Sequence, residues 1–162
     1  MKEGECEMKN QKSLTNKGFS LVELIIVVAI MAILIGVLAP QYLRYVEKSR
    51  LQKDNTSMGE VANVLKMSSA EETVINDLNT AGTATYAFGS DGAMTVSGVT
   101  ALDNELQKTI SLSEVKLTSS TYGKAATKPS IVVTVNTSTN IVTVTGKNWV
   151  NAPGDTAADK KF

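Results

Sequence analysis

The chain has 162 residues, with 16 basic and 16 acidic side chains and a formal net charge of zero. One domain plus an anchor is therefore the expected organisation, and no bulk attraction to nucleic acid or anionic lipid is implied. The chain has no His, and its single Cys is Cys6. The usual nucleophile–base pairs and most transition-metal sites need these residue types, so we expect a non-enzyme without a metal or other cofactor.

The N-terminal segment up to Gly18 is polar. It holds four Lys and three Glu and no apolar core. A secretory signal peptide needs an apolar region before its cleavage site, but here the only long apolar run comes after Gly18. The segment is therefore either a leader whose removal leaves the apolar run as an anchor, or a cytoplasmic tail that is retained.

The apolar run that follows predicts a membrane-spanning helix. Leu24 to Ala39 has no charged residue and only one Gly. Counted from Phe19, the run has about the 20 residues that one helix needs to cross the hydrocarbon core of a bilayer. A lone span must be helical because lipid offers no partners to the backbone. Glu23 is the exception, since an ionised side chain within a span costs roughly 2.5 kcal/mol near the membrane centre and usually marks a function.

Residues 17–24 read Lys-Gly-Phe-Ser-Leu-Val-Glu-Leu. This stretch resembles the prepilin peptidase site of type IV pilins and pseudopilins, in which a basic leader ends in Gly and is followed by Phe, a Glu at the fifth mature position, and an apolar helix. The resemblance covers about 17–50. It implies cleavage between Gly18 and Phe19, N-methylation of Phe19, a cytoplasmic leader and an outward-facing head. Cleavage would also remove Cys6, leaving no thiol. The Lys and Arg counts flanking the span are even, so charge does not decide the orientation.

Glu23 admits three interpretations. It can complement the N-terminal end of the helix dipole, or pair with the new Phe19 amine of its own chain one turn away. The resemblance implies a third, in which Glu23 pairs with the Phe19 amine of a neighbouring subunit. A carboxylate in a dry helix bundle must be paired, so pairing between subunits would favour one axial stagger and promote filament assembly.

Gly36 and Pro40 predict a weak turn late in the apolar run. Pro40 leaves the Gly36 carbonyl without its helical partner and crowds the same turn, and Gly36 is a poorer helix former than Ala by roughly 1 kcal/mol. In similar filaments this region can lose helical order on assembly. The plainer interpretation is a proline kink near the membrane interface, with Tyr42 and Tyr45 as aromatic anchors.

Beyond Pro40 the sequence becomes polar but keeps a helical period. The apolar positions that predict an amphipathic helix are Leu51, Met58, Val61, Ala62 and Leu65. A second helix is predicted over Glu71 to Leu78, with a stop at Asn79, Thr80 and Gly82. We expect a solvated or intersubunit face from the charged residues Arg44, Glu47, Lys48, Arg50, Lys53 and Asp54.

After residue 80 the composition shifts to Thr, Ser, Val and Gly. The pattern predicts strands over Thr83–Phe88, Ala93–Val96 and Val115–Leu117, a short helix over Leu102–Ile110, and a hairpin of Ile131–Val135 and Ile141–Thr145 around the turn Asn136–Asn140. Ile131, Val133 and Val135 are expected to face the long helix, matched by Val142 and Val144. Trp149 is expected in the core or at the sheet edge rather than as an exposed contact, and residues 151–162 as a loosely held polar tail.

These elements predict four parts: a leader (1–18), a transmembrane and polymerisation helix (19–40), an amphipathic helical continuation (41–80) and a globular β-rich head (81–162). A long N-terminal helix packed against a small C-terminal antiparallel sheet is an α+β fold and agrees with a pilin-like arrangement.

The resemblance implies a structural subunit of a type IV pilus-like filament, serving adhesion, twitching motility or a related surface task. Its expected partners are its own copies, a prepilin peptidase, the assembly platform with its ATPase, and the cytoplasmic membrane before assembly. The filament itself would be extracellular. The alternatives are a pseudopilin of a type II secretion or competence system, or a membrane-tethered binding protein that never polymerises. Asp155 and Asp159 do not form a recognisable calcium loop, and Lys124, Lys128 and Lys147 form no dense basic patch for nucleic acid.

Overall fold

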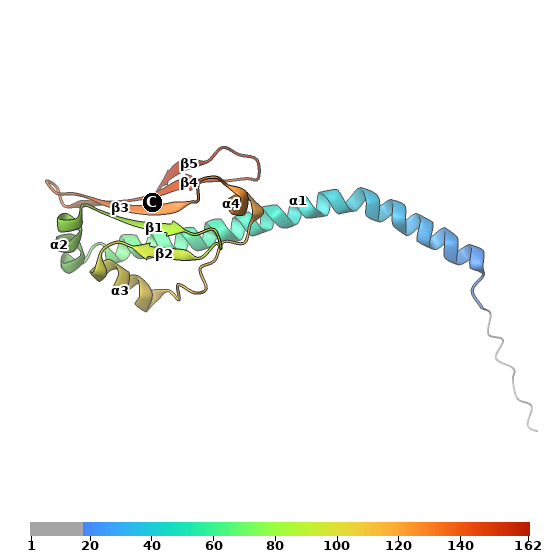
Figure 1. The fold of residues 1–162 in the computed structure, drawn as a ribbon, viewed down its shortest axis with the longest axis horizontal. Coiled ribbons are helices and arrows are strands. Elements are labelled where there is room, and N and C mark those ends of the chain that lie inside the picture. The colour runs from blue at the N-terminus through green and yellow to red at the C-terminus, as the bar shows by residue number, and fades with distance from the viewer. Residues whose placement is uncertain (1–17) are drawn as a thin grey trace, which may run out of the picture. The chain divides into compact units, whose positions relative to one another are not determined.

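The computed structural model describes residues 18–162 (Figure 1). The predicted leader, 1–18, therefore lies outside the described residues apart from Gly18. The chain divides into two compact units, the first extending to Pro40 and the second running from Gln41 to Phe162. One helix, α1 (Leu21–Ser68), belongs to both units and continues through Pro40.

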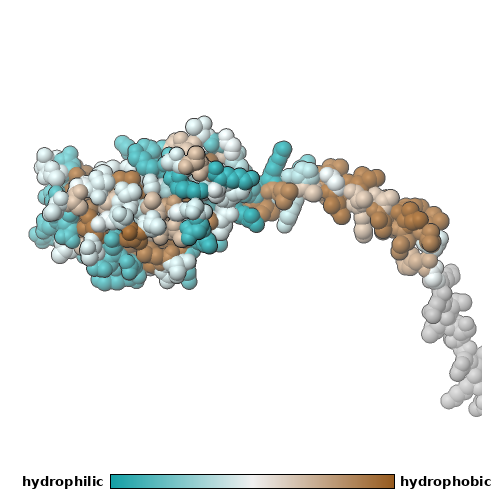
Figure 2. All heavy atoms as spheres, in the orientation of Figure 1, coloured by the Kyte–Doolittle hydropathy of each residue, from teal (hydrophilic) through white to brown (hydrophobic). Residues whose placement is uncertain are grey.

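In the first unit, the part of α1 from Leu21 to Pro40 has no buried side chain. By length and composition, α1 contains a segment apolar enough to cross a membrane. Figure 2 shows apolar side chains along this part of the helix, whereas polar and apolar side chains are mixed on the head. In water such a surface would be unstable, so this segment requires cover from lipid or from other protein.

The second unit contains a five-stranded antiparallel sheet with the strand order β2-β1-β3-β4-β5. Its strands are β1 (Thr83–Phe88), β2 (Met94–Ser97), β3 (Ser130–Asn136), β4 (Ile141–Trp149) and β5 (Ala158–Lys161). The helices that accompany them are α2 (Glu72–Ala81), α3 (Thr100–Thr109) and α4 (Ser120–Lys124). Strands β1 and β3 are neighbours although β2, α3 and α4 lie between them in sequence.

The core forms where the second part of α1 lies along one face of this sheet (Figure 1). The buried residues of α1 include all five that the helical period predicts: Leu51, Met58, Val61, Ala62 and Leu65. The sheet contributes Ala84, Tyr86, Ile131, Val133 and Val144, all buried. Val135 and Val142 are only partly buried against this core. The α+β arrangement predicted from the sequence is thus confirmed, with the long helix covered by a small antiparallel sheet.

Local signals account for most element boundaries. Strand β1 has the predicted bounds, and the β3–β4 hairpin pairs Asn136 with Ile141. Helix α2 ends at Ala81 because Gly82 adopts a positive φ of 75° and donates its N–H to the Leu78 carbonyl.

The expected strand at Val115–Leu117 is wrong, since this segment makes a single bridge between Lys116 and Ala93. Helix α4, which we did not predict, is capped by the Ser119 side chain, which accepts from the Tyr122 N–H.

The expectation of a loose tail after residue 150 is also wrong. Strand β5 pairs with β4, and the Phe162 ring contacts the buried Trp149 edge to face at a centroid distance of 5.2 Å. The Lys160 ammonium lies 4.7 Å from the centre of the Trp149 ring. Trp149 therefore has the core role preferred from the sequence. All four β5 residues are exposed, so no face of this edge strand needs apolar residues, and the alternating pattern that marks a half-buried strand is missing.

Candidate functional site

The N-terminal end of α1 holds the predicted assembly residues. Glu23 lies in the first turn, and its Oε2 accepts a hydrogen bond from the Ser20 backbone N–H at 2.9 Å. The Leu24 N–H donates to the Ser20 carbonyl at 3.2 Å. A carboxylate at the third helical position that accepts from the N-cap N–H is one half of a capping box. The sequence signal for this contact is the Ser-x-x-Glu pattern at residues 20–23.

This hydrogen bond supports the interpretation in which Glu23 complements the N-terminal end of the helix dipole. In a single chain, the carboxylate caps its own helix and lies where the helix dipole favours negative charge. The neighbouring apolar side chains have no cover, since Phe19 is 86% exposed and Leu21 is 74% exposed. The contact to Ser20 uses one carboxylate oxygen of Glu23, so the same group retains acceptor capacity for a cation. Pairing of Glu23 with the Phe19 amine of another copy stays a prediction.

A second polar cluster joins α1 to the α4 segment of the head. Asp54 is only 1% exposed. Its carboxylate accepts from the Thr118 N–H at 2.9 and 3.0 Å, from the Thr118 hydroxyl at 3.1 Å, and from the Ser119 N–H at 2.8 Å. The expectation that Asp54 belongs to a solvated or intersubunit face is therefore wrong. The carboxylate supplies acceptors to N–H groups that lie outside any strand, and buried N–H groups need such partners.

Glu47 makes a similar contact nearer the start of the second unit. Its Oε1 accepts from the Thr121 N–H at 2.7 Å and from the Thr121 hydroxyl at 2.8 Å. Burial acts to raise the pKa of Glu47, but the hydrogen bonds from Thr121 and Ser120 outweigh it and lower the pKa below its ordinary 4.5. Glu47 is therefore ionised at neutral pH.

Tyr122 completes this cluster from the α4 side. Its hydroxyl donates to Asn55 Oδ1 at 2.7 Å and accepts from the Val150 N–H at 3.0 Å. Burial raises the pKa of Tyr122, so the hydroxyl remains protonated and able to donate. We call Glu47, Asp54, Asn55, Tyr122 and their partners the polar seam. It holds the α4 segment and the end of β4 on α1.

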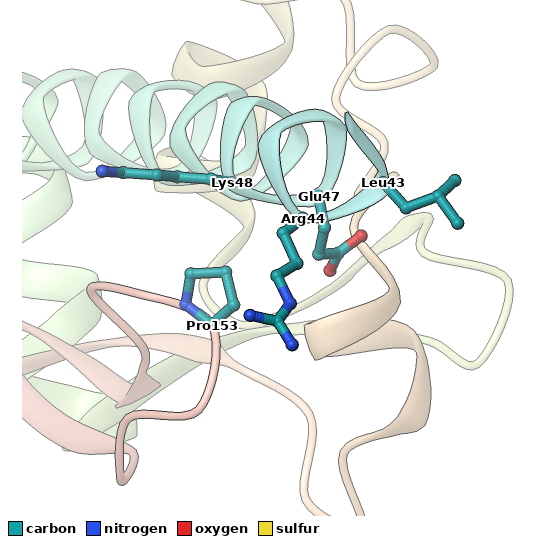
Figure 3. A pocket seen from close by; sticks show the side chains of 5 residues that line it. All are labelled: Leu43, Arg44, Glu47, Lys48 and Pro153. Carbon is teal, nitrogen blue, oxygen red and sulfur yellow. The ribbon is translucent and has the colours of Figure 1, made fainter. Parts of the chain in front are cut away.

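A hollow of about 620 Å³ adjoins the polar seam. It is lined by Leu43, Arg44, Glu47, Lys48 and Pro153 (Figure 3).

Within residues 18–162, no group of three acidic, His or Cys side chains is placed to hold a metal ion. Asp155 instead accepts from the Ala152 N–H, and Asp159 pairs with Lys147. The described residues thus provide three features: the Glu23 cap on α1, the polar seam that holds the head on α1, and an open hollow that contains Arg44 and Lys48.

Comparison with protein families finds one motif, which overlaps the N-terminal part of α1. Residues 13–39 match the family model described as the prokaryotic N-terminal methylation motif. This is the prepilin-type signature of type IV pilins and pseudopilins, so the resemblance drawn from residues 17–24 is confirmed. The match covers the apolar part of α1 and stops before the head. Comparisons with curated proteins and with solved structures found no match.

The chain is thus a protein that carries the type IV pilin and pseudopilin signature on an exposed apolar helix. Its α+β head is of the pilin-like kind, with the helix packed on a small antiparallel sheet.

Asp54→Ala is expected to destabilise the head by roughly 3 kcal/mol, because the buried Ser119 N–H and the Thr118 N–H and hydroxyl lose their acceptor. Urea unfolding of the detergent-solubilised chain, followed by the fluorescence of Trp149, measures this change. The matched control is Glu60→Ala, which removes an exposed carboxylate from the same helix. Equal unfolding midpoints for the two variants would contradict the assigned role of Asp54.

Glu47 is expected to make stability depend on pH in the acid range. Because its pKa is lowered by folding, its contribution is present above the ordinary value of 4.5 and is lost as the pH falls through the lower value of the folded protein. Glu47→Gln should therefore cost roughly 0.5 kcal/mol or less at about pH 7 and less than that at about pH 3. Urea midpoints of both proteins at the two pH values test this. A difference that grows in acid would contradict it.

Proposed function

We propose that this chain is a structural subunit of a type IV pilus-like filament, cleaved between Gly18 and Phe19 and assembled through the apolar part of α1. The observation that carries the proposal is the methylation motif at residues 13–39. It coincides with a helix whose side chains from Leu21 to Pro40 are not covered by any other part of residues 18–162. Lipid supplies that cover before assembly, and the same helices of neighbouring copies supply it afterwards.

In this proposal Glu23 sets the axial stagger between neighbouring copies of α1, which we call the register. Cleavage after Gly18 turns the Phe19 nitrogen into an α-amine that is charged at neutral pH. A carboxylate within a membrane is costly unless it is paired, and the amine of an adjacent copy provides the counter-charge at one axial stagger. The contact between Glu23 and the Ser20 N–H holds the carboxylate at the end of the helix, where such an amine arrives.

The head gives the filament its surface. The motif belongs to structural proteins, and the proposed tasks are adhesion, twitching motility, secretion or DNA uptake by the filament. The proposed partners are other copies of the chain, a prepilin peptidase, and the assembly platform with its ATPase. The proposed location is the cytoplasmic membrane before assembly and the cell surface afterwards. A pseudopilin has the same motif, so gene neighbours that encode a secretion-type machinery would favour that role.

Replacing Glu23 by Val is expected to leave the protein inserted in the membrane and cleaved, but to reduce sheared surface filament by about tenfold or more, because the counter-ion for the amine is lost. Immunoblots of shear and membrane fractions measure both quantities. Glu60→Ala, which removes an exposed carboxylate further along α1, is the control and should assemble normally. Normal filament from the Glu23→Val variant would contradict the proposed register.

A further inference from the structure

The part of α1 that follows Pro40 has an uneven distribution of charge. Four basic side chains are exposed and form no salt bridge within residues 18–162; we call Arg44, Lys48, Arg50 and Lys53 the cationic collar. The two acids between Arg44 and Asp54, which are Glu47 and Asp54 itself, are bound by N–H and hydroxyl groups of the head. The polar seam thus uses the negative charges internally and leaves the positive charges at the surface.

Two residues of the collar border the hollow. Figure 3 shows Arg44 and Glu47 projecting from the same side of α1, with Lys48 extending along the helix. Glu47 lies within this hollow, but its Oε1 is occupied by Thr121 and it forms no salt bridge with Arg44. Leu43 and Pro153 add apolar walls. The hollow therefore combines an unpaired guanidinium and an ammonium with apolar surface.

We propose that the cationic collar and the hollow bind the headgroup of an anionic phospholipid. The collar begins four residues after Pro40, next to the segment apolar enough to span a membrane. Clusters of Lys and Arg beside a span attract anionic headgroups. Tyr42 and Tyr45 flank Leu43 and Arg44 of the hollow in sequence and are 68% and 79% exposed, and Tyr is enriched at membrane interfaces. The inference rests on the proposed membrane-anchored state and not on polymerisation.

The orientation of the chain gives a second argument. In the proposed topology the collar is on the outward side, where flanking segments normally contain few Lys and Arg. Four exposed cations at that position are available to bind a counter-charge. Acids of a second copy are the rival source. Lipid is favoured because the exposed side chains of Tyr42, Leu43 and Tyr45 suit the boundary between headgroups and acyl chains better than an aqueous ion pair.

Native mass spectrometry of the detergent-solubilised full chain tests the inference with two short-chain lipids, dioctanoyl phosphatidylglycerol and dioctanoyl phosphatidylcholine. Phosphatidylglycerol is expected to bind more tightly. Each Lys or Arg near an anionic headgroup contributes roughly fivefold, so the double variant Arg44→Gln, Lys48→Gln should weaken phosphatidylglycerol binding by about 25-fold. Its binding of phosphatidylcholine should not change. Glycerol phosphate at equal concentration should not displace the lipid, because the apolar contacts are absent.

The matched control is Lys66→Gln, Lys116→Gln, which removes the same charge from two exposed sites outside the collar and should bind as the unmodified chain does. Circular dichroism checks that both variants are folded. Equal affinity for the two lipids, displacement by glycerol phosphate, or unchanged binding by the collar variant would each overturn the inference. If the collar variant instead binds lipid normally but associates less with other copies, the collar contacts acids of a second chain. These titrations use monomers, so their failure is distinguishable from failure of the filament proposal.

Discussion

The apolar part of α1 is rich in Leu, Ile and Val and contains one carboxylate, that of Glu23. Its apolar side chains need cover from water, and once they are covered the carboxylate needs a counter-charge. The segment from Leu21 to Pro40 has both needs, since none of its side chains is buried by the part of the chain that the structure describes. Burial contributes about 25 cal/mol for each Å² of apolar surface, so a span of this length is strongly driven into lipid or against other helices. In the proposed filament, Glu23 would restrict that otherwise unspecific association, because a carboxylate in a dry helix bundle has to pair with a cation.

The same helix serves a different purpose after Pro40. There, one face of α1 completes the core of the head with Leu51, Met58 and Leu65. Asp54 and Glu47 accept hydrogen bonds from the α4 segment, so the head is attached by polar contacts as well as by packing. With Glu47 and Asp54 bound inside the protein, the exposed charge between Arg44 and Asp54 is positive. One continuous helix thus provides an apolar segment, a cationic segment and a core face in succession.

The elements that could be predicted are those with a periodic apolar pattern. The helical spacing of Val61, Ala62 and Leu65 indicated the buried face of α1, and alternation in Ile131–Val135 indicated the hairpin. Strand β5 was missed because its residues are exposed on both faces. The burial of Asp54 was missed because its partners, Thr118 and Ser119, are 64 and 65 residues away, and nothing in the local sequence distinguishes a buried carboxylate from a solvated one. The cap formed by Glu23 had a local signal, Ser20-x-x-Glu23, that could have been used.

N-terminal peptide mapping of the native protein by mass spectrometry tests most directly whether the apolar part of α1 is an assembly element. We predict a mature chain that begins at Phe19 and carries an N-methyl group, because in the proposed filament this helix assembles only after the leader is removed. A native protein that retains residues 1–18 and remains a monomer in the membrane would contradict it.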